Sequence, residues 1–98
     1  MKDFAGQVVW ITGASSGIGE ALAYELAKKG ATLVLSARRS ERLQAVRSRC
    51  ERAAAHYVLP FDITEIDALP GHVERVLAMC GQIDVLINNA GVSQRALV

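Results

Sequence analysis

The glycines at positions 13, 17 and 19 are the feature that most restricts what this chain can fold into. They lie in the segment 12–19, between the apolar run 8–11 and a segment with helical periodicity. Gly13 lets the chain turn sharply off a strand, where a side chain would clash. Gly17 leaves no Cβ where a pyrophosphate must approach, and Gly19 lets the next helix pack close to the sheet. The spacing therefore predicts a strand–loop–helix unit whose helix N-terminus receives a diphosphate.

Glycine-rich turns also form without a ligand, so the surroundings of the loop decide its interpretation. Apolar residues follow the loop at helical spacing, and Gly30 stands where a helix-terminating glycine is expected. A loop for a nucleoside triphosphate needs Gly-Lys-Ser or Gly-Lys-Thr at the helix start, and the segment 17–20 has neither. The pattern favours a dinucleotide, and a tight turn without a ligand remains the alternative.

Two further motifs accompany the glycine loop. Asp62-Ile63 closes the apolar run 57–59, and the segment 88–91, Asn-Asn-Ala-Gly, follows the apolar run 85–87. Together the three motifs cover nearly the whole chain. In these residues the chain resembles the classical short-chain dehydrogenases/reductases, and its glycine loop is similar to theirs letter for letter. The resemblance implies a nicotinamide cofactor and hydride transfer between that cofactor and a carbonyl or alcohol substrate.

Apolar runs alternate with helix-period segments along the whole chain. The runs predict strands at about 7–12, 32–36, 56–60 and 84–88. The periodic segments predict helices at about 17–29, 40–54 and 65–80. The strands are continuously apolar, which is typical of parallel strands covered on both faces. Right-handed crossovers then give the strand order 3-2-1-4. We expect an α/β fold, the N-terminal half of a Rossmann-type doubly wound parallel sheet.

The expected second and third helices each carry an apolar stripe that would face the sheet. Their predicted buried residues are Leu43, Val46, Cys50 and Ala53, followed by Val73, Val76, Leu77 and Cys80. The fourth strand would leave a bare apolar edge unless further chain paired with it. We therefore expect residues 1–98 to be one partial domain, the cofactor-binding portion of a longer single-domain enzyme.

Composition argues against several other classes of protein. Hydrophobic residues make up 51% of the 98 residues and charged residues 21%, as in globular domains. The net charge of +1 gives no reason to expect a nucleic-acid partner, and no apolar stretch reaches the roughly 20 residues that a membrane helix needs. Cys50 and Cys80 lack the spacing of metal ligands, so we expect no metal site. Residues 1–4 leave no room for a signal peptide before the first strand, and a cytoplasmic protein is expected.

The resemblance implies which part of the cofactor each motif meets. The loop would hold the diphosphate, Asp62 would accept a hydrogen bond from the adenine amino group, and Ile63 would pack on its ring. The segment 88–91 would lie along the ribose, with Asn89 in a structural role. Asp62 equally fits a helix cap beside Thr64. The expected cofactor-binding residues are Gly13, Ser15, Ser16, Gly17, Ile18, Gly19, Ser36, Arg38, Arg39, Asp62, Ile63, Asn88, Ala90 and Gly91.

The end of the second expected strand indicates which dinucleotide binds. An acidic residue there bonds the adenosine ribose and selects the form without a 2′-phosphate. Ala37 holds that position here, and Arg38 follows it. A guanidinium grips a phosphate in a bidentate manner, and Ser36 and Arg39 would add donors. The resemblance implies NADP. NAD is the less favoured alternative, kept because some NADP-binding members carry a basic residue where Ser16 stands.

Four further arginines follow in the expected second helix, and they have a simpler interpretation. Acidic residues are interspersed with them and no aromatic residues interleave, so they do not form a nucleic-acid face. We expect mostly solvated surface charge for Arg42, Arg47, Arg49 and Arg52.

Tyr24 and Lys28 match the spacing Y-x-x-x-K, which the resemblance assigns to the catalytic tyrosine and lysine of the family. They lie on the first helix beyond the glycine loop, away from the expected place of the nicotinamide. We therefore interpret them as a packing tyrosine and a solvated lysine near a helix C-terminus. The catalytic serine, tyrosine and lysine would follow Val98, so no catalytic residue is assigned here and the chain alone is expected to be inactive.

Two other functions fit the same sequence. A non-catalytic NADP(H)-binding or sensor module would use the fold without the tyrosine–lysine pair, and a degenerate member would have a purely structural role. The intact glycines, Arg38 and Asp62 argue against the structural role. For the full-length protein, the resemblance implies a small carbonyl or alcohol substrate and a homo-oligomer.

Overall fold

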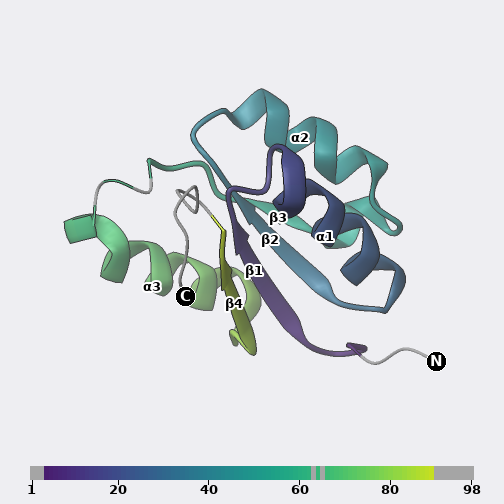
Figure 1. Cartoon of the computed structure of the whole chain (residues 1–98). Coiled ribbons are helices and arrows are strands. Elements are labelled where there is room, and N and C mark those ends of the chain that lie inside the picture. The colour runs from purple at the N-terminus through teal and green to yellow at the C-terminus, as the bar shows by residue number, and fades with distance from the viewer. Residues whose placement is uncertain (1–3, 63, 65, 90–98) are drawn as a thin grey trace.

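The computed structural model describes residues 4–62, 64 and 66–89, which form one parallel sheet with helices on both faces. The strands are β1 (Val8–Thr12), β2 (Thr32–Ser36), β3 (Tyr57–Val58) and β4 (Val85–Asn88). The helices are α1 (Gly17–Lys28), α2 (Ser40–Arg49) and α3 (Leu69–Cys80), with short 3-10 helices at Ala53–Ala55 and Ile66–Ala68. The sheet order is β3-β2-β1-β4, and Figure 1 shows α1 and α2 on one side of the sheet with α3 on the other. This confirms the predicted half of a doubly wound sheet.

Two apolar clusters, one on each face of the sheet, form the core. Alternate residues of a strand point to opposite faces. Ile11 and Leu35 therefore join the cluster under α1 and α2, whereas Trp10 and Val34 join the cluster with Val76 of α3. All five residues of β1 are buried. Because both faces are covered, the two central strands carry no polar alternation, and their sequences are continuously apolar.

The edge strand β4 departs from the predicted two-sided burial. Its residues alternate between half-buried and exposed, and Leu86 is 49% exposed. Within the described chain β4 pairs only with β1, so the expected apolar edge is confirmed. The predicted stripe of α3 is wrong at one position, because Leu77 is exposed beside the fully buried Val76.

The second helix ends earlier than predicted because Cys50 has an extended backbone, with φ −79° and ψ 147°. α2 stops at Arg49, and Arg52 adopts a left-handed backbone with φ 57°. In that position the Arg52 guanidinium donates to the carbonyl oxygens of Ala27 and Ala31, at 2.8 and 3.1 Å. Ala27 lies in the last turn of α1, where carbonyl groups lack helical partners. The chain after α2 therefore supplies hydrogen-bond donors to the carbonyl groups at the C-terminal end of α1.

The third strand is shorter than predicted because a side chain takes the place of a backbone acceptor. The buried His56 ring accepts the Leu33 N–H at Nδ1, 3.1 Å away, just before the first β2–β3 pair. Its Nε2 lies 2.8 Å from the carbonyl oxygen of Glu51. A neutral ring that is protonated on Nε2 satisfies both contacts. Pro60, which has no N–H, follows the strand.

The third helix begins four residues later than predicted. A 3-10 helix precedes it, and Pro70 occupies the first turn of α3, where a missing N–H costs nothing. In the part of the chain that the structure describes, no helix is both long and apolar enough to cross a bilayer.

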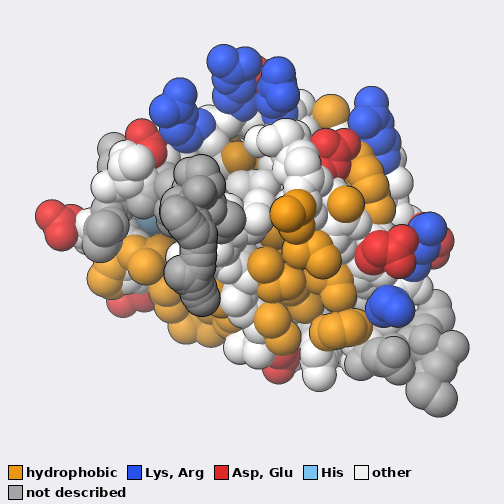
Figure 2. All heavy atoms as spheres, in the orientation of Figure 1, with side chains coloured by type: hydrophobic (Ala, Val, Ile, Leu, Met, Phe, Trp, Pro, Cys, Tyr) orange, Lys and Arg blue, Asp and Glu red, His pale blue; other side chains and the backbone are white. Residues whose placement is uncertain are grey.

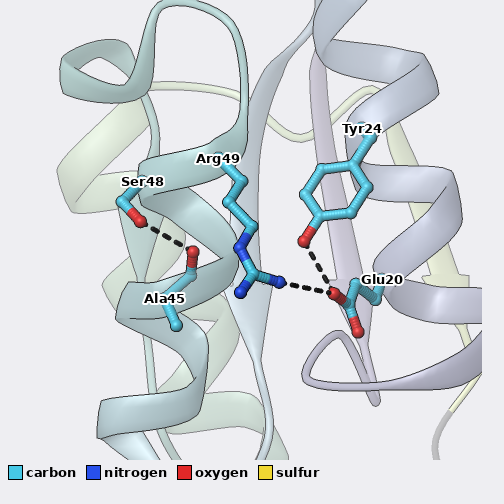
Figure 3. A network of polar contacts seen from close by, with 5 residues as sticks. All are labelled: Glu20, Tyr24, Ala45, Ser48 and Arg49. Atoms are coloured by element: carbon cyan, nitrogen blue, oxygen red, sulfur yellow. Dashed lines mark hydrogen bonds and ion pairs between the residues drawn. The ribbon is translucent and has the colours of Figure 1, made fainter.

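Three of the four arginines predicted to be mostly surface charge also bond to neighbouring parts of the fold. Arg47 donates from Nε to the carbonyl oxygen of His56 at 2.9 Å. Arg49 lies 3.5 Å from a carboxylate oxygen of Glu20 on α1, which also accepts the Tyr24 hydroxyl at 2.7 Å (Figure 3). With the Arg52 contacts above, three of these four arginines have structural partners. The expectation of surface charge holds for Arg42, Arg49 and Arg52, which are exposed, and Arg47 is half-buried.

Candidate cofactor-binding site

The carboxyl ends of the strands meet at one edge of the sheet, and hydrogen bonds hold the connecting loops there. The Ala14 N–H donates to the carbonyl oxygen of Ser36 at 3.1 Å, which draws the glycine loop toward the end of β2. From the other side, the Asn89 side-chain amide donates to the carbonyl oxygen of Gly13 at 3.2 Å. Ligands of open α/β sheets bind at this edge, where the strand order reverses.

The glycine loop has the geometry that the spacing predicts. Gly13 and Gly17 adopt positive φ angles of 67° and 58°. A Cβ on Gly17 would meet no protein atom within 4 Å, whereas a Cβ on Gly19 would overlap the carbonyl oxygen of Gly13 and lie 2.9 Å from the Asn89 amide nitrogen. Gly19 is therefore required by helix packing, and Gly17 faces open space that a ligand can enter.

The first turn of α1 offers unused donors to that space. The N-cap residue Ser16 makes no side-chain capping bond, so its hydroxyl does not occupy the N–H groups at the start of the helix. Ser16, Gly17 and Ile18 are exposed, and Ile18 is 68% exposed. Free N–H groups at the positive end of a helix dipole suit an anion.

A cavity of about 340 Å³ lies beside the loop, lined by Ser15, Arg38, Arg39 and Arg42. Figure 2 shows Lys and Arg side chains gathered along the upper edge of the molecule, over the start of α2 in Figure 1. Within the described chain, the guanidinium groups of these three arginines form no hydrogen bond or ion pair. Arg42 lines this cavity although the sequence analysis did not include it among the expected cofactor-binding residues, and its place in the first turn of α2, three residues after Arg39, was the available signal.

Asp62 lies within range of the Arg38 charge and has one engaged carboxylate oxygen. Its Oδ1 accepts the Thr64 N–H at 2.9 Å and the Thr64 hydroxyl at 2.7 Å. The Thr64 hydrogen bonds hold the Asp62 pKa below its ordinary value, and the Arg38 charge contributes in the same direction. Oδ2 has no bond to another described residue, so local capping leaves an acceptor for a ligand.

The expectation for Ser36 is corrected. Its side chain is 1% exposed, and its hydroxyl accepts the indole N–H of Trp10 at 2.9 Å. Side chains alternate between the two faces of a strand, and the Ser36 side chain points into the core. Arg38 and Arg39, which follow it, line the cavity. Ser36 thus supports the site through its backbone carbonyl, which holds Ala14.

The end of β4 also contributes. Thr12 on β1 donates from Oγ1 to the Asn88 side-chain oxygen at 2.8 Å, so this side chain is oriented across the two strand ends. The Asn89 bond to Gly13 has the tying role that was expected of it. The predicted contacts Ile63, Ala90 and Gly91 lie outside the residues that the structure describes.

Tyr24 and Lys28 have partners on their own helix. The Tyr24 hydroxyl donates to Glu20, and Lys28 lies 3.7 Å from a carboxylate oxygen of Glu25 (Figure 3 shows Tyr24 and Glu20). Burial raises the Tyr24 pKa first, with Glu20 adding to the shift, which is opposite to the shift that a tyrosine general base needs. Among residues 4–62, 64 and 66–89, no three His, Cys, Asp or Glu side chains are grouped so that they could hold a metal ion.

Comparisons with known proteins agree with this geometry. The family model described as short chain dehydrogenase matches residues 7–98. The human "Dehydrogenase/reductase SDR family member 7" is 47% identical over 100 residues, which cover 97% of this chain and 30% of that protein. The "11-beta-hydroxysteroid dehydrogenase-like 2" of Arabidopsis thaliana is 42% identical over 98 residues, covering 98% of this chain and 32% of that protein.

A solved structure gives the same fold. The crystal structure of a metagenomic short-chain oxidoreductase in complex with NADP is 44% identical, has a TM-score of 0.78, and is matched over 91% of this chain and 41% of its own. The chain spans about 30% of the length of the curated relatives that it matches. With three motifs in order, the 3-2-1-4 sheet and a family match over residues 7–98, this chain belongs to the short-chain dehydrogenase family.

Proposed function

We propose that the protein is an NADP(H)-dependent oxidoreductase and that residues 1–98 carry its cofactor-binding portion. The observation that carries the proposal is the cavity between the glycine loop and α2, because among the described residues three arginines line it and no carboxylate does. An acidic lining would select the dinucleotide without a 2′-phosphate, whereas guanidinium groups attract the phosphate. The family membership supports a nicotinamide cofactor, and the NADP-bound relative supports NADP.

In this proposal the expected site residues bind different parts of the cofactor. The open space at Gly17 and the free N–H groups of α1 receive the diphosphate, and Arg38 receives the 2′-phosphate. The free Asp62 oxygen accepts the adenine amino group, and Asn88 is oriented toward the ribose by Thr12. When bound, the cofactor supplies hydride exchange with a carbonyl or alcohol substrate.

The test is the substitution Arg38→Asp in the complete protein, with dissociation constants measured for NADPH and NADH. A charge-assisted bond to phosphate contributes about 1.5–3 kcal/mol, so NADPH should bind at least about 10-fold more weakly. NADH has no 2′-phosphate, and its dissociation constant should change by less than about 3-fold. An unchanged ratio of the two constants would refute the assignment of Arg38.

A non-catalytic NADP(H)-binding module is the second candidate. It is favoured because the Y-x-x-x-K pair in the described part of the chain, Tyr24 and Lys28, contacts glutamates of its own helix. Steady-state oxidation of NADPH by the complete protein with a panel of small ketones and aldehydes separates the two. Turnover supports the oxidoreductase, whereas tight binding without turnover supports the module.

A further inference from the structure

We infer that Arg42 is a specificity-determining residue of the dinucleotide site. From the first turn of α2, its guanidinium group contacts the 2′-phosphate of the bound dinucleotide. The inference rests on the proposed function and deepens it. Arg42 is the third residue of α2, and it lines the cavity together with Arg39, three positions earlier. Residues at this spacing lie on the same helix face, so both guanidinium groups are presented to the same side.

Ser15, on the opposite element, fixes where this cavity lies. The neighbouring Ala14 N–H binds the Ser36 carbonyl oxygen at 3.1 Å, which holds the glycine loop against the end of β2. The cavity is consequently bounded by the glycine loop on one side and by Arg38, Arg39 and Arg42 on the other. A group bonded to Arg38 in this space also meets the charge of Arg42.

The charges here run against the ordinary preference of a helix start. The N-terminal end of a helix carries partial positive charge and favours acidic residues. Instead Arg39 is the N-cap without a side-chain capping bond, and Arg42 follows in the first turn, with Glu41 as the acidic residue there. A local violation of this kind is expected at functional sites, where a bound anion offsets the repulsion.

The other arginines of α2 have polar partners in the described part of the chain, whereas Arg42 does not. Arg47 is engaged with a backbone carbonyl and Arg49 with Glu20. Arg42 has no hydrogen bond or ion pair to another residue in the described part of the chain. It is therefore the arginine within α2 that is both beside the cavity and available to a ligand.

The test compares Arg42→Gln with Arg49→Gln in the complete protein, using adenosine 2′,5′-bisphosphate and 5′-AMP as probes in a calorimetric titration. Both variants lose one positive charge from α2, so a general field effect weakens the two alike. We expect Arg42→Gln to weaken the bisphosphate by about 3- to 10-fold with less than about 2-fold change for 5′-AMP. Arg49→Gln should leave both probes within about 2-fold of the unmodified protein.

The outcomes separate this inference from the function on which it rests. If Arg38→Asp removes the preference for the bisphosphate and Arg42→Gln does not, the role of Arg42 is refuted and the proposed function stands. Equal losses in Arg42→Gln and Arg49→Gln also refute it, since the effect is then general charge. If the unmodified protein shows no preference for the bisphosphate over 5′-AMP, the proposed NADP function itself fails.

Discussion

Replacing Gly19 by alanine tests the packing that shapes the glycine loop. Gly19 is the third residue of the 12-residue helix α1. The added Cβ would overlap the carbonyl oxygen of Gly13 and lie 2.9 Å from the amide nitrogen of Asn89. The carbonyl oxygen is a backbone atom and cannot swing away, whereas the Asn89 side chain can move only by giving up its hydrogen bond to Gly13. Either the start of α1 or the turn after β1 must move.

The expected cost follows from these contacts. Forcing extra volume into a packed region costs about 1–3 kcal/mol. Losing the Asn89–Gly13 hydrogen bond adds about 1 kcal/mol. Alanine regains up to about 1 kcal/mol through its higher helix propensity. The free energy of unfolding should therefore fall by about 1–4 kcal/mol, and the displaced helix start should weaken NADPH binding.

Gly71→Ala is the matched control, because Gly71 is also the third residue of a 12-residue helix and its Cβ would meet nothing within 4 Å. There the substitution should be neutral or stabilise by about 0.4–1 kcal/mol. Urea unfolding of the complete protein measures both variants. Equal free energies of unfolding for Gly19→Ala and Gly71→Ala would refute the close approach of α1 to the loop.

Two other substitutions probe the core and the excluded catalytic pair. Burial holds the His56 pKa below its ordinary value, with the nearby Arg47 and Arg52 charges adding to the shift. Because the unfolded chain takes up the proton more readily, stability should be complete above pH about 6.5 and decline as the pH falls below it. His56→Ala should cost about 2–4 kcal/mol at pH 8, since two bonds are lost and the Leu33 N–H is left buried and unpaired, and it should flatten the dependence of urea midpoints between pH about 5 and 7. A variant with the unmodified pH profile would contradict this role. Tyr24→Phe removes the hydroxyl that donates to Glu20. The complete protein should lose about 0.5–1.5 kcal/mol of stability and keep its turnover rate. A loss of turnover by orders of magnitude would restore Tyr24 as a catalytic candidate.

The features that sequence predicted well are those with local causes. Strand order follows from alternating apolar runs and crossover handedness, and the close helix packing at Gly19 follows from the glycine spacing. These properties depend on neighbours in the chain, which the sequence displays directly.

The features that sequence missed depend on partners far along the chain. Ser36 was predicted to be a cofactor donor because it lies at a strand end, but its hydroxyl is buried and accepts the Trp10 indole N–H. Arg52 is exposed as predicted, but it also donates to carbonyl oxygens more than 20 positions away. No motif or spacing marks His56, yet its ring substitutes for a backbone acceptor of the Leu33 N–H in β2. None of these pairings has a periodicity or a spacing that sequence could reveal.

A crystal structure of the complete protein with NADPH tests the central claim most directly, because it locates both phosphate groups. The account predicts the diphosphate at the first turn of α1, beside Gly17, and the 2′-phosphate within hydrogen-bond distance of Arg38, in the cavity that Ser15 also lines. A 2′-phosphate in solvent, away from this cavity, or a cofactor bound elsewhere would contradict it.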